Sequence, residues 1–373
     1  MDEMKQMLQQ ILEQNKTLQK DWEWSGHVVT SYNYNFNNPK SQANRLRVFD
    51  EKANTFRLNS AELNVGKPST TESPWGFGLT LNLGTDAEKI HSAGLGLAST
   101  DNPLDIQQAF VTYKWNVENG VDFKAGKFVT LLGQEVIESP NNFNISRSLL
   151  FGFAIPFTHT GLLVSYPVVP DLFTTTVGVV NGWDNVDDNN DGKSLTWQLA
   201  LTPRKNLTIL ANGIYGPEQA SKTSPKRTVG DLVVSYKPIE PLTLALNLDL
   251  AFEDRVPLTG LTKDAYWYGV AAYAGYDLTD RLTVSLRGEY FVDEDGARTG
   301  TSAVNTATGL SDRLNLWEIT TTLKIKLREK LFARLEYRHD QAAGRVKTAF
   351  DKKNGTFNRG QQDTVGVELY YQF

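Results

Sequence analysis

The chain has 373 residues, of which 40% are hydrophobic and 22% are charged, and its mean hydropathy is -0.37. Nowhere does it hold about 18 consecutive apolar residues, which excludes transmembrane helices. A formal charge of -5 gives no basic surface for nucleic acid, and the absence of cysteine excludes disulfides and thiol chemistry. No signal peptide follows Met1, so an exported protein would begin here at its mature or a re-engineered start.

The first 22 residues carry a heptad pattern that the rest of the chain lacks. Intervals of four and three residues alternate through Met4, Leu8, Ile11, Asn15, Leu18 and Trp22. This spacing predicts a short helix that is marginal alone and that a coiled coil of several copies would stabilise. Leu8 and Ile11 favour three or four helices in that seam, Leu18 continues it, and Asn15 would fix its register. An amphipathic tail without a partner is the alternative.

From Trp24 onward the hydrophobic period changes to two residues, the period of a β-strand. One face of the last segment consists of Val365, Val367, Leu369, Tyr371 and Phe373. In other segments the apolar face is aliphatic in the middle and aromatic towards the ends, as in Tyr266, Tyr268, Val270, Ala272, Ala274 and Tyr276. That distribution matches a hydrocarbon band between two aromatic belts. We therefore predict an all-β fold, a closed antiparallel transmembrane barrel.

About sixteen such segments follow one another, and the connections between them alternate in length. The segments lie near 24–36, 55–66, 75–84, 105–116, 120–128, 158–167, 172–182, 194–202, 206–216, 228–237, 241–253, 265–278, 281–292, 314–328, 330–339 and 362–373. The long connections are 37–54, 85–104, 129–157, 183–193, 217–227, 254–264, 293–313 and 340–361. Short periplasmic turns and long outer loops are typical of outer-membrane barrels. An even strand number places both termini in the periplasm, so we predict a periplasmic helix (1–22) and a barrel (23–373).

The longest connection, 129–157, is too apolar for a solvated loop tip. It contains Leu131, Val136 and Phe143, followed by an apolar run over 149–153. We predict that it folds into the lumen, where Glu135, Glu138 and Arg147 would form a constriction. General-diffusion porins use the loop at this ordinal position in that way, which is an analogy of architecture. An outer loop packed on a neighbouring subunit or on lipid is the alternative.

The strand period also predicts which charged side chains face the lumen. The expected pore-lining residues are Lys114, Lys124, Arg287, Glu289, Lys324, Arg334, Glu336 and Arg338. Basic residues opposite loop carboxylates would set a transverse field that orients dipolar solutes. The alternative is that these residues form solvent-exposed ion pairs on the lumen wall, each contributing ~0–1 kcal/mol to stability.

Two patterns that suggest metal binding or catalysis are incomplete. Asp187, Asn189 and Asp191 open a calcium-loop pattern, but the twelfth position is Gln198 rather than Glu. We therefore expect a hydrated loop and no metal site. His159 and Ser165 share a strand but lie six residues apart, too far for a hydrogen bond, and no G-x-S-x-G motif occurs. No enzyme activity and no cofactor are predicted.

Residues 126–184 carry a family resemblance. Its motifs are Gly126-Lys127-Phe128, Gly133-Gln134-Glu135, Asn144-Ile145-Ser146-Arg147-Ser148-Leu149-Leu150-Phe151, Ile155-Pro156-Phe157-Thr158-His159-Thr160-Gly161, Ser165-Tyr166-Pro167 and Val179-Val180-Asn181-Gly182-Trp183-Asp184. The chain resembles the OmpL-like β-barrel porins of Gram-negative outer membranes. Phe373 at the C-terminus is similar to the signal read by the barrel-insertion machinery, and the 1–22 pattern resembles periplasmic coiled coils of some trimeric porins.

The resemblance implies a porin-type role. With the barrel pattern, we predict an outer-membrane porin for passive diffusion of small polar or charged solutes through a water-filled lumen. The expected partners are outer-membrane lipid and lipopolysaccharide, solutes and ions, and further copies of the chain in a homotrimer, with no nucleic acid. A plugged, structural or adhesive barrel is the main alternative, and an outer-membrane hydrolase is a weaker one.

Overall fold

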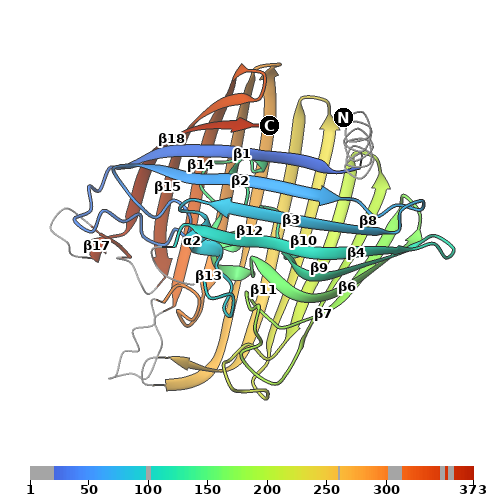
Figure 1. Cartoon of the computed structure of the whole chain (residues 1–373). Helices are drawn as coiled ribbons and strands as arrows, with labels where there is room; N and C mark the ends of the chain where they lie inside the picture. The colour runs from blue at the N-terminus through green and yellow to red at the C-terminus, as the bar shows by residue number, and fades with distance from the viewer. Residues whose placement is uncertain (1–20, 98–101, 259–260, 301–312, 345–348, 352–356) are drawn as a thin grey trace, which may run out of the picture.

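Sixteen antiparallel strands form one closed barrel in the computed structural model (Figure 1). The structure describes residues 21–97, 102–258, 261–300, 313–344, 349–351 and 357–373. The predicted all-β closed antiparallel barrel of about sixteen strands is confirmed. The predicted helical seam of Leu8, Ile11, Asn15 and Leu18 lies outside the described residues.

The barrel strands follow one another around the wall in sequence order. They are β1 (Glu23–Asn35), β2 (Thr55–Lys67), β3 (Trp75–Leu83), β4 (Leu104–Trp115), β5 (Val121–Val129), β6 (Thr158–Val169), β7 (Phe173–Val180), β8 (Ser194–Arg204), β9 (Leu207–Gly216), β10 (Arg227–Ile239), β11 (Leu242–Leu258), β12 (Leu261–Thr279), β13 (Leu282–Asp293), β14 (Leu314–Arg328), β15 (Leu331–Gly344) and β18 (Gln361–Gln372). The described loops add a two-stranded sheet of β16 (Phe350–Asp351) and β17 (Phe357–Arg359). They also hold the short helical segments α2 (Ala87–Ile90), η1 (Ser139–Asn141) and η2 (Leu150–Ala154).

The two ends of the barrel differ in the length of their connections. At the short-turn end the strands are joined by 68–74, 116–120, 170–172, 205–206, 240–241, 280–281 and 329–330. The other connections reach the long-loop end. The predicted loop 254–264 is wrong, because β11 and β12 continue as a hairpin beyond a bulge between Glu253 and Val256. Val256 pairs with Lys263, so strand pairing resumes beyond the residues at which the hydrophobic alternation of the sequence stops.

Side chains alternate between the inside and the outside of the wall, as the period of two requires. On β15, Arg334, Glu336 and Arg338 are buried, whereas Leu335 and Tyr337 between them are 48% and 46% exposed. A row of exposed aliphatic and aromatic side chains around a closed barrel fits a lipid surround. No helix in the described ranges is long and apolar enough to cross a membrane.

The barrel is closed where β1 meets β18. Gly26 and Phe373 exchange two backbone hydrogen bonds of 3.1 and 3.0 Å beyond the paired register. The Phe373 ring packs directly over Gly26, where an added Cβ would lie 2.5 Å from the Cζ atom. A side chain at position 26 would therefore displace the C-terminal ring.

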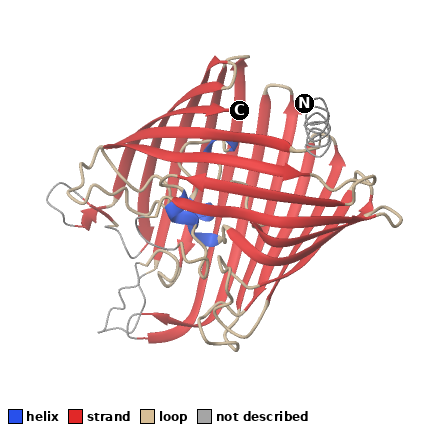
Figure 2. Cartoon of the chain, viewed as in Figure 1, coloured by secondary structure: helices blue, strands red, loops and turns tan. Residues whose placement is uncertain are grey.

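Three long loops form a small hydrophobic core inside the barrel. Figure 2 shows helical segments within the ring of strands. Phe49, from the loop after β1, lies 5.9 Å from Phe151 and 5.5 Å from Phe157, measured between ring centres. Ile90 of α2 is buried in the same cluster. Burial of these side chains fixes the 129–157 segment against the loop after β1.

Candidate functional site

The 129–157 segment runs along the inner wall of the barrel. The Gly133 N–H donates to Asp231 on β10 at 3.2 Å, and the Gln134 N–H donates to Asn247 on β11 at 3.1 Å. Gly133 has a φ of +93°, and a Cβ there would lie 2.4 Å from the Ile155 Cδ1 atom. Glycine is required at this turn, where the backbone reaches the wall.

Two wall carboxylates hold the backbone of the segment. Glu289 on β13 accepts the N–H groups of Leu149 and Leu150, each at 2.6 Å. Glu336 on β15 accepts those of Ile145 and Ser146 at 2.5 and 3.0 Å. Each carboxylate satisfies two consecutive donors that no helix or sheet would otherwise use. A hydrogen bond to a charged group contributes about 1.5–3 kcal/mol.

Arg287 is the central cation of this wall, with an exposed fraction of 1%. It donates to Glu318 on the neighbouring strand at 2.6 Å and to Glu135 of the segment at 2.8 Å. It also reaches the Ser146 carbonyl oxygen at 2.6 Å. One guanidinium thus ties the wall to two points of the segment.

Arg334 and Arg338 repeat this arrangement on β15. Arg334 donates to Glu368 at 2.7 Å and to the Ser139 carbonyl oxygen at 3.0 Å. Arg338 donates to Asp340 at 2.8 Å and to the Arg147 carbonyl oxygen at 2.7 Å. Their exposed fractions are 1% and 0%. Both guanidinium groups therefore bridge wall carboxylates and carbonyl oxygens of the segment.

The expected pore-lining residues fall into two groups. Arg287, Glu289, Arg334, Glu336 and Arg338 point inward as their parity requires, but the 129–157 segment covers them. The period of two gives the face of a strand and cannot show what lies over it. The lysines Lys114, Lys124 and Lys324 remain partly exposed towards the short-turn end.

The three expected constriction residues also differ from one another. Glu135 is buried against Arg287 and accepts the Ser148 N–H at 2.6 Å. Arg147 folds back on its own segment, lies over the Phe49 ring at 4.7 Å and pairs with Asp86 at 3.5 Å. Only Glu138 is partly exposed, and it accepts a hydrogen bond of 2.5 Å from Gln107 on β4.

The residues of the incomplete calcium and catalytic patterns are not grouped into a site. Among the described residues no three His, Cys, Asp or Glu side chains are grouped to hold a metal ion. The loop with Asp187, Asn189 and Asp191 is instead closed by its own bonds, such as Asn190 Oδ1 accepting the Gly192 N–H at 2.8 Å. His159 bonds to the Gly182 carbonyl at 2.9 Å, while Ser165 bonds to Thr176 at 2.8 Å.

Residues 21–373 match the protein family described as "Putative beta-barrel porin-2, OmpL-like". The chain belongs to this family. Three solved structures share the fold of this porin. The anion-selective porin from Comamonas acidovorans is 11% identical with a TM-score of 0.61, and 94% of this chain and 99% of that chain are covered. DcaP of Acinetobacter baumannii is 13% identical, with a TM-score of 0.59 and coverage of 94% and 97%. The loop L8 deletion mutant of OmpT from Vibrio cholerae is 12% identical with a TM-score of 0.59, and 94% of this chain and 99% of that chain are covered. No curated protein matches the porin.

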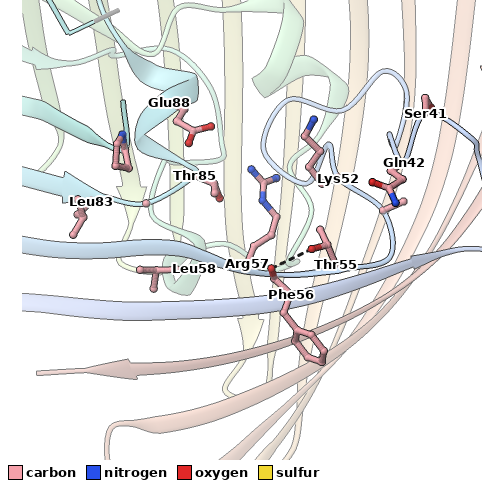
Figure 3. Close-up of a pocket in the computed structure, with 13 residues that line it drawn as sticks. Ser41, Gln42, Lys52, Thr55, Phe56, Arg57, Leu58, Leu83, Thr85 and Glu88 are labelled. Atoms are coloured by element: carbon pink, nitrogen blue, oxygen red, sulfur yellow. Dashed lines mark hydrogen bonds between the residues drawn. The ribbon is translucent and has the colours of Figure 1, made fainter. Parts of the chain in front are cut away.

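A cavity of about 710 Å³ lies at the long-loop end of the porin. Figure 3 shows Arg57 and Phe56 leaving β2 in opposite directions beside it. Phe56 is 82% exposed, and Leu58 and Leu83 are also exposed lining residues. The lining of the cavity therefore includes residues from both faces of β2.

Further cavities open at the short-turn end, and two of them are lined by lysines expected in the pore. One of about 560 Å³ is lined by Asp277, Lys324, Lys326 and Phe332 of the β12–β15 wall. The other, of about 420 Å³, is lined by β1–β5 residues that include Asn64, Thr80, Phe110 and Lys124. The lysines expected to line the pore of this porin, Lys124 and Lys324, thus lie at opposite walls.

Sequence reasoning missed a polar chain across β1 to β4. His27 bonds to Ser60 at 3.0 Å, Ser60 donates to Asn82 at 2.8 Å, and Asn82 donates to Gln107 at 3.1 Å. Gln107 then reaches Glu138, so the chain ends on the 129–157 segment. The strand period of two places all four polar side chains on the inner face of neighbouring strands, and the sequence could have shown this.

Proposed function

We propose that this outer-membrane porin lets small polar or charged solutes diffuse passively through a lumen narrowed by the 129–157 segment. The observation that carries the proposal is the anchoring of that segment to the wall by Glu289, Glu336 and three buried arginines. A segment held by charge-assisted bonds on several strands keeps its shape while solutes pass. Passive diffusion then needs neither a cofactor nor an energy source.

The charged groups in the lumen set the proposed selectivity. Arginines of β13 and β15 are neutralised by carboxylates and carbonyl oxygens, so they act as anchors. Glu138, Lys124 and Lys324 keep access to solvent and would act on passing solutes. Charges of both signs in a narrow, weakly screened lumen orient dipolar solutes.

The proposed assembly is a homotrimer with the short-turn end in the periplasm. Both described chain ends, near Asp21 and at Phe373, lie at the short-turn end. The 1–22 heptad would form a periplasmic coiled coil, and lipid and lipopolysaccharide would surround the exposed apolar belt. Removal of residues 1–22 should weaken the oligomer in mild detergent. Truncated protein that still migrates wholly as the full-length oligomer would refute this role of the helix.

A plugged structural barrel is the second candidate, favoured by the near-complete burial of inner-wall side chains such as Asn212, Thr196 and Arg338. Current through the purified oligomer in a planar bilayer separates the two. Stepwise conductance in triplets supports an open trimeric porin, and the reversal potential in a salt gradient gives its ion preference. A silent bilayer with correctly folded protein supports the plug. For the hydrolase alternative, the pair considered from the sequence is not brought together, because His159 bonds to Gly182 and Ser165 to Thr176.

A further inference from the structure

The barrel wall has a step between β2 and β3 at the long-loop end. β2 pairs with β1 as far as Thr55, but its pairing with β3 stops at Ala61. The chain after β3 covers part of the remaining edge, because the Thr85 N–H donates to the Leu58 carbonyl oxygen at 3.1 Å. Residues 55–57 pair as a strand with β1 alone in the described part of the chain. The 710 Å³ cavity lies at this step, which is why both faces of β2 contribute to its lining.

Two cations line the inner part of this cavity without forming a salt bridge to any described residue. Arg57 is 9% exposed and donates a 3.2 Å hydrogen bond to the Phe49 carbonyl oxygen. Lys52 is exposed, and Figure 3 shows its side chain on the same side of β2 as that of Arg57. The Arg57 charge also acts on Asp86, but Asp86 pairs with Arg147 at 3.5 Å. Both cations can therefore bind an anion that enters the cavity.

Polar groups that suit a sugar lie beside the two cations. Glu88 is the one acid among the described residues of the lining, and it forms no salt bridge with them. The Oγ1 atom of Thr85, also in the lining, is buried and has no hydrogen-bond partner within the described ranges. Sugar hydroxyls donate to a carboxylate and exchange hydrogen bonds with a threonine hydroxyl. The inner part of the cavity therefore matches a sugar that carries an anionic group.

Apolar side chains line the outer part of the same cavity. Phe56 is 82% exposed, and Leu58 and Leu83 are 47% and 44% exposed. Tyr32 on β1 extends this surface, with 4.7 Å between its ring centre and that of Phe56. Outward apolar and aromatic side chains of a barrel wall contact lipid. An acyl chain can thus lie on this surface while its headgroup occupies the inner part.

We propose that the cavity binds the phosphorylated glucosamine headgroup of a lipopolysaccharide molecule, with phosphate at Arg57 and Lys52 and an acyl chain against Phe56. The inference goes beyond passive diffusion and rests on the proposed orientation, which puts the long-loop end in the outer leaflet. The volume of about 710 Å³ lies within the range of ~300–1,000 Å³ for ligand pockets. Phosphate would meet the two cations while sugar hydroxyls meet Glu88 and Thr85. Free phosphate and a simple phospholipid headgroup lack one of these two features.

The test measures binding of deep-rough lipopolysaccharide, labelled on its core sugar, to the full-length protein in detergent by fluorescence anisotropy. Lys52→Gln and Arg57→Gln should each weaken binding about tenfold, because each removes a charge-assisted bond to phosphate. Lys222→Gln, at an exposed lysine of another loop at the same end, is the control. Lys52 is exposed, so Lys52→Gln tests the proposal even should Arg57→Gln fail to fold. Affinity that Lys52→Gln and Lys222→Gln leave equally unchanged overturns the proposal.

Phe56→Ser tests the acyl contact on the outer face. It should weaken lipopolysaccharide binding about fivefold, because an apolar contact with the acyl chain is lost. Tyr215→Ser is the matched control, since Tyr215 is 49% exposed on β9 and does not line the cavity. Equal affinities of these two variants would overturn the assignment of the chain to this face.

Unlabelled competitors distinguish the sources of the phosphate. Lipopolysaccharide should displace the labelled probe at a concentration about tenfold lower than phosphatidylglycerol, which offers phosphate without a sugar. Equal displacement by phosphatidylglycerol, or displacement by inorganic phosphate at the same concentration, overturns the glycolipid assignment.

Failure of this proposal is distinct from failure of the proposed function. Current in a bilayer free of lipopolysaccharide tests the open porin without the lipid site. Normal current together with binding that none of the cavity variants alters refutes the lipid site alone.

Discussion

Two places on the inner wall differ in how their charged side chains are paired. On β13, β15 and β18, Arg287 and Arg334 each meet a carboxylate and carbonyl oxygens of the 129–157 segment. On β2 and β5, Glu62 has one oxygen without a hydrogen-bond partner among the described residues, and the Lys124 ammonium lies 4.4 Å from the centre of the Phe110 ring. The paired charges at Arg287 and Arg334 hold the segment. Neither Glu62 nor Lys124 forms a salt bridge with an oppositely charged lysine, arginine or carboxylate among the described residues, so neither ties the segment to the wall in this way.

Of the changes that test this difference, substitution of Arg287 should have the largest effect on the stability of the protein. Arg287→Met leaves Glu135 buried without its counter-charge and leaves Glu318 with Arg338 alone, 3.7 Å away. Breaking a buried pair in this way costs about 3–5 kcal/mol in free energy of unfolding. Denaturant unfolding in detergent, followed by tryptophan fluorescence, measures the loss. Lys324→Met on the neighbouring strand is the control, because this half-buried lysine forms no salt bridge within the described residues. Equal stability of the two variants would refute the anchoring role of Arg287.

Neutralising one carboxylate on each wall should give effects of different size. Glu289→Gln loses charge-assisted bonds to two N–H groups, and we expect about 1.5–3 kcal/mol of destabilisation. Glu62→Gln removes an uncompensated charge, so its free energy of unfolding should stay equal or rise. The same unfolding experiment compares both. Destabilisation of Glu62→Gln as large as that of Glu289→Gln would remove the distinction between the walls.

A smaller effect on stability is expected from a change of pH, through the carboxyl group of Asp86 beside Arg147. Burial raises the pKa of Asp86 to about 6 from 3.8, and the Arg147 and Arg57 charges offset part of that rise. The folded protein therefore keeps this proton up to pH 6, whereas the unfolded chain releases it near 4. This stabilising contribution is complete below about pH 4 and is lost as the pH rises through 6.

Denaturation midpoints at pH 5 and pH 7.5 test this linkage. The midpoint should be higher at pH 5, and Asp86→Asn should reduce the difference between the two pH values. A midpoint difference that Asp86→Asn leaves unchanged would assign the pH dependence to other groups.

Sequence patterns predicted the wall well and the interior poorly. A period of two placed Arg287, Glu289 and Arg338 on the inner face, because alternation is a local property of each strand. Their coverage by the 129–157 segment depends on contacts between residues 139 or more positions apart, such as Leu150 with Glu289. Nothing local marks Glu62 as an acid without a cation. The hairpin extension around Val256 was missed because pairing resumes beyond a bulge.

Single-channel conductance of a protein lacking residues 134–147 tests the central claim most directly. Those residues carry Glu135, Glu138 and Arg147, and their removal frees the wall arginines from the segment. We predict a clearly higher conductance than that of the full-length protein, with a deletion of 219–224 in an outer loop as the control. Unchanged conductance in folded 134–147 deletion protein would contradict a lumen narrowed by this segment.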